Sequence, residues 1–84
     1  MAEQLVGTVT HYFGKPGVAG ITLSGGLKLG DTIRIVGHTS NFTQVVESLQ
    51  IDHDDVEAAK AGDEIGIVVV ERAREHDKVY RVIA

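Results

Sequence analysis

The chain has 84 residues, of which 43% are hydrophobic, carries a formal net charge of −4 at pH 7 and contains no cysteine. A chain of this length supports one hydrophobic core, so residues 1–84 are predicted to form a single domain without a separate catalytic domain beside it. The acidic balance disfavours sequence-independent binding to duplex nucleic acid, which needs a cluster of cations, and the lack of cysteine excludes disulfides and thiolate zinc sites.

The N-terminal part of the chain predicts two strands joined by a turn. Residues 5–13 alternate, with three large apolar side chains on one face: Leu5, Val9 and Phe13. Residues 14–17, which include Pro16, have the composition of a turn. Residues 18–24 resume the alternation. We therefore expect an antiparallel hairpin at the start of the domain.

Two Gly-Asp pairs, each directly ahead of an alternating strand, are the clearest turn signals. Gly30-Asp31 precedes a predicted strand over residues 32–36, and Gly62-Asp63 precedes one over residues 64–70. Glycine supplies a positive φ without steric cost, and aspartate accepts hydrogen bonds from the turn backbone. Both pairs therefore predict tight turns that lead into strands.

The segment between these two strands is less regular. A strand is predicted over residues 42–51, but Val45 and Val46 are apolar and adjacent, so its period slips. A β-bulge near residues 46–48 would restore both side chains to useful faces. Residues 52–61 are the one stretch with helical spacing, and two aspartates near its start could cap one or two helical turns.

The C-terminal part predicts strands over residues 64–70 and 78–83, joined by a charged connection over residues 71–77. The first of these strands is apolar on both faces, with Ile65, Ile67 and Val69 pointing one way and Val68 and Val70 the other. A strand of this kind in a one-core domain indicates either strong twist or a surface for a partner.

These elements define the predicted architecture. Six strands without crossover helices must pair antiparallel, and a sheet this small avoids exposed edges best by closing on itself. The predicted fold class is therefore all-β, a small six-stranded antiparallel β-barrel that is closed or nearly closed.

Catalytic and metal-site patterns are weak. The glycine-rich segment 24–30 differs from a phosphate-binding loop, because Lys28 precedes its last glycine and no helix follows. The acidic segment 52–55 lacks the ligand spacing of a zinc site and is interpreted as a solvated turn. No serine lies in a nucleophile-elbow motif. We therefore expect no enzyme activity, bound nucleotide, metal ion or cofactor.

Aromatic and basic residues form the more informative set. The candidate residues for contacts with RNA or another partner are Tyr12, Lys15, Arg34, Arg72 and Arg74. Single-stranded RNA is held by rings that stack on bases, beside cations that follow the phosphates. The competing interpretation is a solvated surface, in which Arg72 and Arg74 pair with neighbouring glutamates and Phe13 belongs to the core.

Longer motifs carry a family resemblance. LKLGD at residues 27–31 and AGDEIG at 61–66 resemble the second domain of translational GTPases, the β-barrel of elongation factor Tu and its relatives. VGTVTHY at 6–12, VESLQ at 46–50 and ERARE at 71–75 are at least as similar to the C-terminal barrel of collagenase-like peptidases and tRNA-modifying relatives. Both resemblances imply the barrel type shared by elongation factors and certain reductases.

Two departures limit what these resemblances imply. Elongation factors place Thr-Gly-Arg in the second strand where this chain has Gly20-Ile21-Thr22, so their grip on the end of an aminoacylated tRNA does not transfer. The Gly-Asp pair common before the last strand is here His76-Asp77, and histidine tolerates a positive φ better than most residues.

Together the residues and the resemblances lead to a primary functional hypothesis and an alternative. The first is a non-catalytic, translation-factor-like binding module that docks on tRNA, on ribosomal RNA or on an RNA-handling partner. The alternative is a protein-interaction subunit equivalent to the detached C-terminal barrel of a collagenase-like peptidase or tRNA-hydroxylating enzyme, whose catalytic part is a separate protein chain. A small hydrolase is the least favoured hypothesis.

The location of the protein is also predicted from the sequence. The acidic N-terminus lacks an apolar signal core, and the longest apolar run, residues 67–70, is too short to cross a bilayer. We therefore expect a cytoplasmic protein without membrane contact.

Overall fold

The computed structural model describes residues 2–15 and 17–83, and these form an all-β structure. All recorded strand pairs are antiparallel. The described residues contain no helix that is long and apolar enough to span a membrane. The strands are β1 (Ala2–Phe13), β2 (Val18–Leu23), β3 (Leu27–Lys28), β4 (Thr32–Val36), β5 (Asn41–Val45), β6 (Gln50–Ile51), β7 (Asp54–Asp55), β8 (Ala58–Ala59), β9 (Glu64–Val68) and β10 (Lys78–Ile83).

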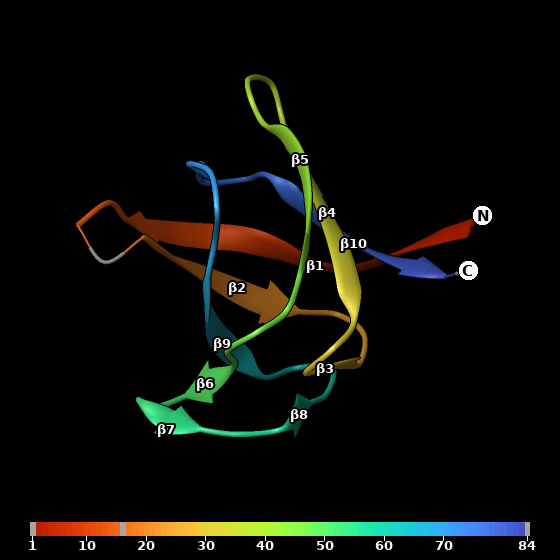
Figure 1. Ribbon diagram of the computed structural model, residues 1–84, viewed down its shortest axis with the longest axis vertical. Coiled ribbons are helices and arrows are strands. Elements are labelled where there is room, and N and C mark those ends of the chain that lie inside the picture. The colour runs from red at the N-terminus through yellow and green to blue at the C-terminus, as the bar shows by residue number, and fades with distance from the viewer. Residues whose placement is uncertain (1, 16, 84) are drawn as a thin grey trace.

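The strands form one large curved sheet and one small ribbon (Figure 1). The order in the large sheet is β5-β4-β10-β1-β2-β9-β6-β7, and β3 pairs with β8 in the ribbon. This arrangement confirms the predicted all-β antiparallel fold class. The six predicted strands correspond to β1, β2, β4, β5 with β6, β9 and β10, and the remaining strands have two residues each.

β5, one of the two end strands of the sheet, meets the end of β9 and the residues after it at a seam. No backbone ladder closes this seam among the described residues, so full closure of the barrel is not confirmed. The Gln44 side chain bridges it instead. Its Nε2 donates to the Val68 carbonyl at 2.8 Å, and its Oε1 accepts the Val70 N–H at 2.8 Å. The amide of Gln44 thus takes the place of one peptide unit of a neighbouring strand.

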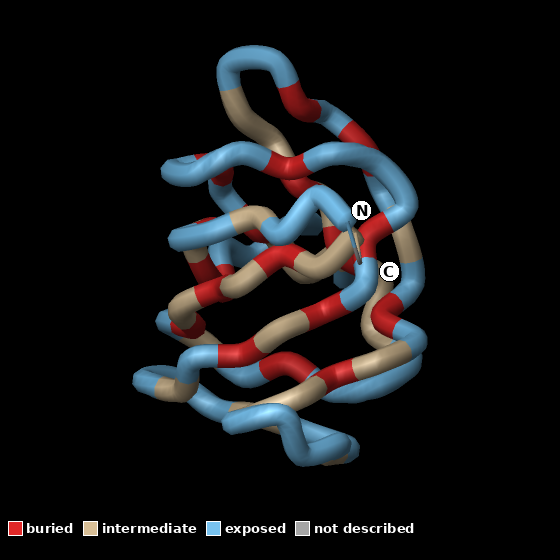
Figure 2. The backbone as a smooth tube through the Cα atoms, turned by 90° about the vertical axis from the view of Figure 1, so that its left-hand side faces the viewer, coloured by how far each residue is buried: buried red, intermediate tan, exposed pale blue. Residues whose placement is uncertain are grey.

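Buried residues are distributed along most of the strands (Figure 2). They form one hydrophobic core, which consists mainly of aliphatic side chains. Buried and more exposed residues alternate along β2, β4 and β9 as the sequence predicts, since side chains of successive strand residues point to opposite faces. The fully buried large side chains are Val6, Val9, Ile21, Ile33, Ile35, Val46, Leu49, Ile67 and Val79.

Three equivalent turns fix the ends of strands. In each turn an aspartate N–H donates to the carbonyl three residues before it, at 3.1 Å, and the aspartate Oδ2 accepts the N–H of that same residue. The residue before the aspartate has a positive φ of 90° at Gly30, 93° at Gly62 and 74° at His76. The two Gly-Asp turns and the histidine in place of glycine are thereby confirmed.

The predicted helix over residues 52–61 is wrong. This segment contains β7 and β8, and a two-residue turn joins β6 to β7. Asp52 and His53 at the centre of that turn have φ values of 51° and 67°. A hairpin turn with positive φ at both central positions matches the twist of the flanking strands, and aspartate is among the residues that tolerate this conformation.

The strand predicted over residues 42–51 is interrupted rather than bulged. β5 pairs with β4, whereas β6 pairs with β7 and β9, so the chain crosses from one neighbour to another. Val46 and Leu49 are both buried in the intervening segment. The slip in the apolar period therefore marks a change of partner.

The first strand also differs from its prediction. The register of β1 shifts between Leu5 and Gly7 and again between Val9 and His11. These irregularities change which residues point inward, so Leu5 and Phe13 are exposed while Tyr12 packs against the core. The expectation that Phe13 is a core residue is wrong. Pro16, within the predicted turn, lies outside the described residues.

Candidate functional site

The loop between β9 and β10 carries two of the candidate arginines and is firmly attached to β1. The His76 N–H donates to the Val9 carbonyl and the Val9 N–H donates to the Asp77 carbonyl, both at 2.8 Å. Ala73 is buried and anchors the middle of the loop. Because Ala73 points inward, Arg72 and Arg74 on either side of it are directed to the surface.

These arginines border a hollow of about 430 Å³ that we call the arginine groove, lined by His11, Tyr12, Arg72, Ala73, Arg74 and Glu75. The guanidinium carbon of Arg72 lies 6.0 Å from the centre of the Tyr12 ring, at the outer limit of a cation–π contact. His11 Nδ1 lies 3.8 Å from Glu75 Oε1, and both side chains are more than half exposed.

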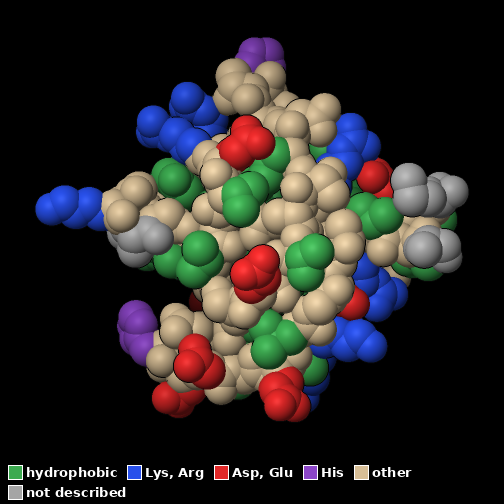
Figure 3. Space-filling view, viewed as in Figure 1, with side chains coloured by type: hydrophobic (Ala, Val, Ile, Leu, Met, Phe, Trp, Pro, Cys, Tyr) green, Lys and Arg blue, Asp and Glu red, His purple; other side chains and the backbone are tan. Residues whose placement is uncertain are grey.

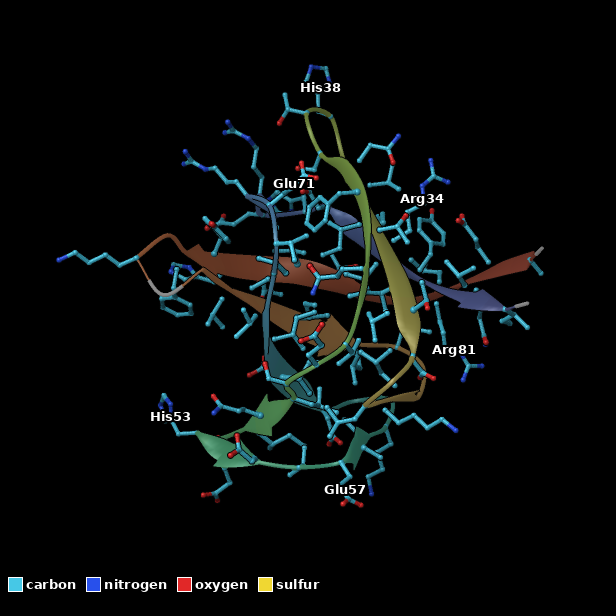
Figure 4. All side chains as sticks on the ribbon, viewed as in Figure 1. Arg34, His38, His53, Glu57, Glu71 and Arg81 are labelled. Carbon is cyan, nitrogen blue, oxygen red and sulfur yellow. The ribbon has the colours of Figure 1, made fainter. Side chains whose placement is uncertain are left out.

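The structure brings three of the five predicted site residues together. Tyr12, Arg72 and Arg74 line the arginine groove. Lys15 lies in the turn after β1 and does not line this groove. Arg34 lies on β4, where it donates to Glu3 Oε1 at 3.2 Å and to Asn41 Oδ1 at 3.1 Å. It is separate from the loop between β9 and β10, on which Figure 4 labels Glu71.

The competing interpretation is that glutamates neutralise the loop arginines by pairing with them. The ion pairs of the structure bear on this interpretation. Glu75 lies beside His11. The ion pairs recorded among residues 2–15 and 17–83 are His11–Glu75 and Arg34–Glu3, and neither includes Arg72 or Arg74. Among the described residues, the loop glutamates therefore form no ion pair with the loop arginines.

The side chains of the groove are aromatic, basic and acidic. The groove presents the phenol of Tyr12, an imidazole, two guanidinium groups and the carboxylate of Glu75, and no serine, threonine or cysteine lines it. Within the described part of the chain, no three His, Asp or Glu side chains lie close enough to hold a metal ion. Sequence reasoning missed the role of Glu75, because its contact with His11 spans two segments that only the fold brings together.

A second exposed feature is a row of apolar side chains that we call the apolar strip. Phe13 pairs with Val18 across β1 and β2, and Val18 pairs with Val68 across β2 and β9, so the three lie side by side on the outer face. The strip continues over the seam at Gln44 to two further exposed residues, Val45 and Val70. Figure 3 shows hydrophobic side chains on the face that β5 turns to the viewer, with acidic and other residues between them.

The strip confirms one sequence-based prediction. Val68 is 51% exposed and Val70 is 70% exposed, whereas Ile65, Ile67 and Val69 are buried. The strand therefore does present apolar side chains on both faces, as its pattern predicts, although β9 itself ends at Val68. Exposed apolar residues gathered on one face are typical of surfaces that contact other proteins.

Comparison with known proteins shows strong similarity over nearly the whole chain. An uncharacterized protease of Methanocaldococcus jannaschii is 45% identical over 76 residues, which cover 89% of this chain and 19% of that protein. A collagenase of Porphyromonas gingivalis is 41% identical over 78 residues, which cover 90% of this chain and 22% of the collagenase. The chain thus spans about a fifth of the length of these relatives. No family model matches the sequence.

Solved structures show the same fold. The C-terminal domain of a putative U32 peptidase of Geobacillus thermoleovorans superimposes with a TM-score of 0.89 at 20% identity, covering 95% of this chain and 93% of that domain. A selenomethionine variant of that domain superimposes with a TM-score of 0.86. The resemblance to the barrel of collagenase-like peptidases is thereby supported, whereas the resemblance to translational GTPases stays a prediction.

Proposed function

We propose that this chain is a non-catalytic interaction domain of a collagenase-like or U32-peptidase-like protein, whose peptidase portion lies outside these 84 residues. The observation that carries the proposal is the extent of the similarity: nine-tenths of this chain match only a fifth of a protease or a collagenase. The fold is also that of a peptidase C-terminal domain that was crystallised separately. This proposal keeps the relation to a peptidase C-terminal barrel from our second sequence-based hypothesis, which placed the catalytic part in a separate protein chain.

The apolar strip is the surface that we propose contacts the peptidase portion. Its side chains lie outside the core, although the core has ample aliphatic residues without them. Phe13 is 50% exposed and Val45 is 47% exposed, so both remain available for burial against a partner. Burial of apolar surface contributes about 25 cal/mol per Å², which makes such a strip the natural centre of an interdomain contact.

Catalysis and location are part of the same proposal. We propose a binding role and not a hydrolytic one, because the chain matches only about a fifth of the protease and of the collagenase. We place the domain in the cytoplasm, because its sequence contains no cysteine and small secreted domains commonly depend on disulfides.

A domain replacement tests the proposal. The 76-residue matching segment of the M. jannaschii protease is exchanged for this chain, and amide hydrogen exchange is compared between the chimaera and the isolated chain. We expect amides around the apolar strip to exchange about tenfold more slowly in the chimaera, which corresponds to about 1.4 kcal/mol of docking free energy. Equal exchange in the two proteins would exclude docking through this surface.

Two variants of the chimaera locate the contact. Val68→Lys combined with Val70→Lys should return the exchange rates to those of the isolated chain, because a lysine does not fit an apolar interface. The control is Leu29→Lys, which changes an exposed leucine outside the strip and should leave the protection unchanged. Loss of protection in the control alone would place the contact elsewhere.

The arginine groove favours RNA as a second candidate ligand. An aromatic ring next to two guanidinium groups is the combination that holds single-stranded RNA, through stacking and phosphate contacts. The supporting observation is the position of Arg72 over the Tyr12 ring, with Arg74 on the same loop. This candidate corresponds to the first sequence-based hypothesis.

A binding titration tests the RNA candidate. We expect Arg72→Ala combined with Arg74→Ala to weaken binding to tRNA about tenfold and to reduce its salt dependence, since two phosphate contacts are lost. The control is Lys28→Ala combined with Lys60→Ala, which removes the same charge at exposed positions outside the groove. Equal weakening by both pairs would show that only net charge matters, and the groove would then have no role.

A further inference from the structure

Two glycines face outward side by side on neighbouring strands. Gly20 on β2 and Gly66 on β9 are register partners, and the next outward pair along the strands is Val18 with Val68. Glycine in a strand interior is less stable than alanine by about 0.5–1 kcal/mol, because it loses more conformational freedom on folding. The stability that is lost at two paired glycines of one sheet therefore needs an explanation.

The fold itself does not require glycine at either position. The glycines with positive φ among the described residues are Gly17, Gly30 and Gly62, so neither Gly20 nor Gly66 depends on a left-handed backbone. A Cβ atom on Gly20 would lie 3.6 Å from its nearest neighbour, the His11 carbonyl oxygen. A Cβ atom on Gly66 would lie 3.4 Å from Val18 Cγ1. Both positions have room for a methyl group.

The missing side chains leave a hollow of about 500 Å³ that we call the glycine trough. Gly20 and Gly66 form its floor. One wall carries Phe13 and Val18, and the other carries Gln50, Asp52 and His53. The trough opens between the turn after β1 and the turn between β6 and β7, where Figure 4 labels His53.

The floor and the first wall suit an aromatic side chain. Without side chains at Gly20 and Gly66, a flat ring can lie directly on the backbone of β2 and β9. The Phe13 ring is half exposed and is held by His11, whose ring centre lies 4.4 Å away. A ring in the trough would thus meet a positioned aromatic partner, and such pairs add about 0.5–1.5 kcal/mol beyond the area that they bury.

The second wall suits a cation. Asp52 lies in the turn between β6 and β7, with Asp54 and Asp55 close behind it. The Asp55 carboxylate accepts a hydrogen bond from Gln50 Nε2 at 2.9 Å, whereas Asp52 takes part in no recorded side-chain hydrogen bond or ion pair of the described residues. The carboxylate of Asp52 is therefore placed to meet a Lys or Arg side chain from outside.

We propose that the glycine trough is a docking site for a protein segment that carries an aromatic side chain close in sequence to a lysine or arginine. The aromatic ring lies on the two glycines against Phe13, and the cation meets the acidic turn at Asp52. This inference rests on the proposed interaction role of the chain and adds the chemistry of the segment that it binds. Aromatic and basic anchors in small pockets commonly carry most of the affinity at such sites.

The test is a titration of the full chain with short synthetic peptides, followed by the amide NMR signals of the chain. The probe is a peptide of about ten residues with one tryptophan, two lysines and otherwise serine and glycine, a length that spans about 33 Å when extended. We expect the amide signals of Gly20, Gly66 and Gln50 to shift with a Kd below about 1 mM. Probes with alanine for tryptophan, or with glutamate for lysine, should bind about tenfold more weakly.

Three variants of the chain complete the test. Gly20→Val fills the trough and should weaken binding about tenfold, while circular dichroism and the Tm show that the fold is retained. Asp52→Asn removes the charge but keeps a residue that tolerates the positive φ, and should weaken binding about threefold. Glu57→Gln removes the same charge at an exposed position outside the trough and should leave binding unchanged (Figure 4).

Three results would overturn the proposal. These are a lack of any shift at about 1 mM peptide, shifts confined to the arginine groove, and full binding by Gly20→Val. Perturbation of the trough by dilution of the chain alone would assign this surface to a second copy of the chain instead. Phe13 and Val18 belong to both surfaces, but the chimaera variants change Val68 and Val70, which do not line the trough, so either proposal can fail while the other stands.

Discussion

Gly7→Ala is expected to destabilise the domain by about 2–3 kcal/mol, although it adds a single methyl group. Gly7 lies in the middle of β1, between Leu23 on one side and Val79 on the other. An added Cβ atom would lie 2.7 Å from Ile21 Cγ2 and 2.9 Å from the Thr22 carbonyl oxygen. The second of these atoms is backbone, so β1 and β2 would have to move apart.

Thermal and chemical unfolding of the variant measure this effect. In a domain of this size each kcal/mol lowers the Tm by about 4–8 °C, so the change is large enough to follow by circular dichroism. The matched control is Gly20→Ala on the adjoining strand, where the new Cβ atom finds ordinary contact distances. That variant should be as stable as the parent or more stable by up to about 1 kcal/mol. Equal destabilisation by both would contradict our account of the β1–β2 contact.

Asp77→Ala is the second change with a large expected effect, about 2–3 kcal/mol of lost stability. The Asp77 carboxylate is buried, and its Oδ2 accepts the Arg74 N–H at 2.9 Å. Its Oδ1 lies so close to Gly37 that a side chain at Gly37 would overlap it. Replacement by alanine therefore leaves a backbone N–H without its acceptor and opens a gap next to Gly37.

The matched control uses the same turn in a more exposed place. In Asp63→Ala an equivalent hydrogen bond is lost, from the Lys60 N–H to Asp63 Oδ2 at 3.0 Å, but water can replace the acceptor there. We expect a cost of about 0.5–1.5 kcal/mol in this variant, measured by the same denaturant titrations. A larger loss in Asp63→Ala than in Asp77→Ala would show that burial does not set the contribution of these turns.

The Asp77 turn also connects stability with the candidate site. Asp77 closes the loop that carries Arg72 and Arg74, and the His76 and Asp77 backbone ties that loop to Val9 of β1. The turn at Asp77 borders the arginine groove. The equivalent turns at Asp31 and Asp63 precede β4 and β9 and border no candidate site. The candidate residues of the groove belong to a loop whose backbone is hydrogen-bonded to β1.

Local sequence patterns determined much of the fold. Strand positions follow from alternation of side chains, as in β2, β4 and β9, and the Gly-Asp turns follow from the φ that the backbone needs there. Both depend on neighbouring residues in the chain, so a single sequence contains the signal. The exposure of Val68 and Val70 was readable for the same reason.

The tertiary structure decided which residues meet across strands. Two register shifts in β1 turn Phe13 outward, and a tight turn at Asp52 and His53 replaces the predicted helix. Such features depend on pairing with distant strands, and a slip of one residue exchanges the two faces of a strand. For that reason the sequence alone could not distinguish Arg34 from Arg72 as candidate site residues. The fold places Arg72 in the arginine groove and Arg34 outside it. The pairing of Gly20 with Gly66 is likewise a product of register, because the two residues that share one floor are 46 positions apart in the chain.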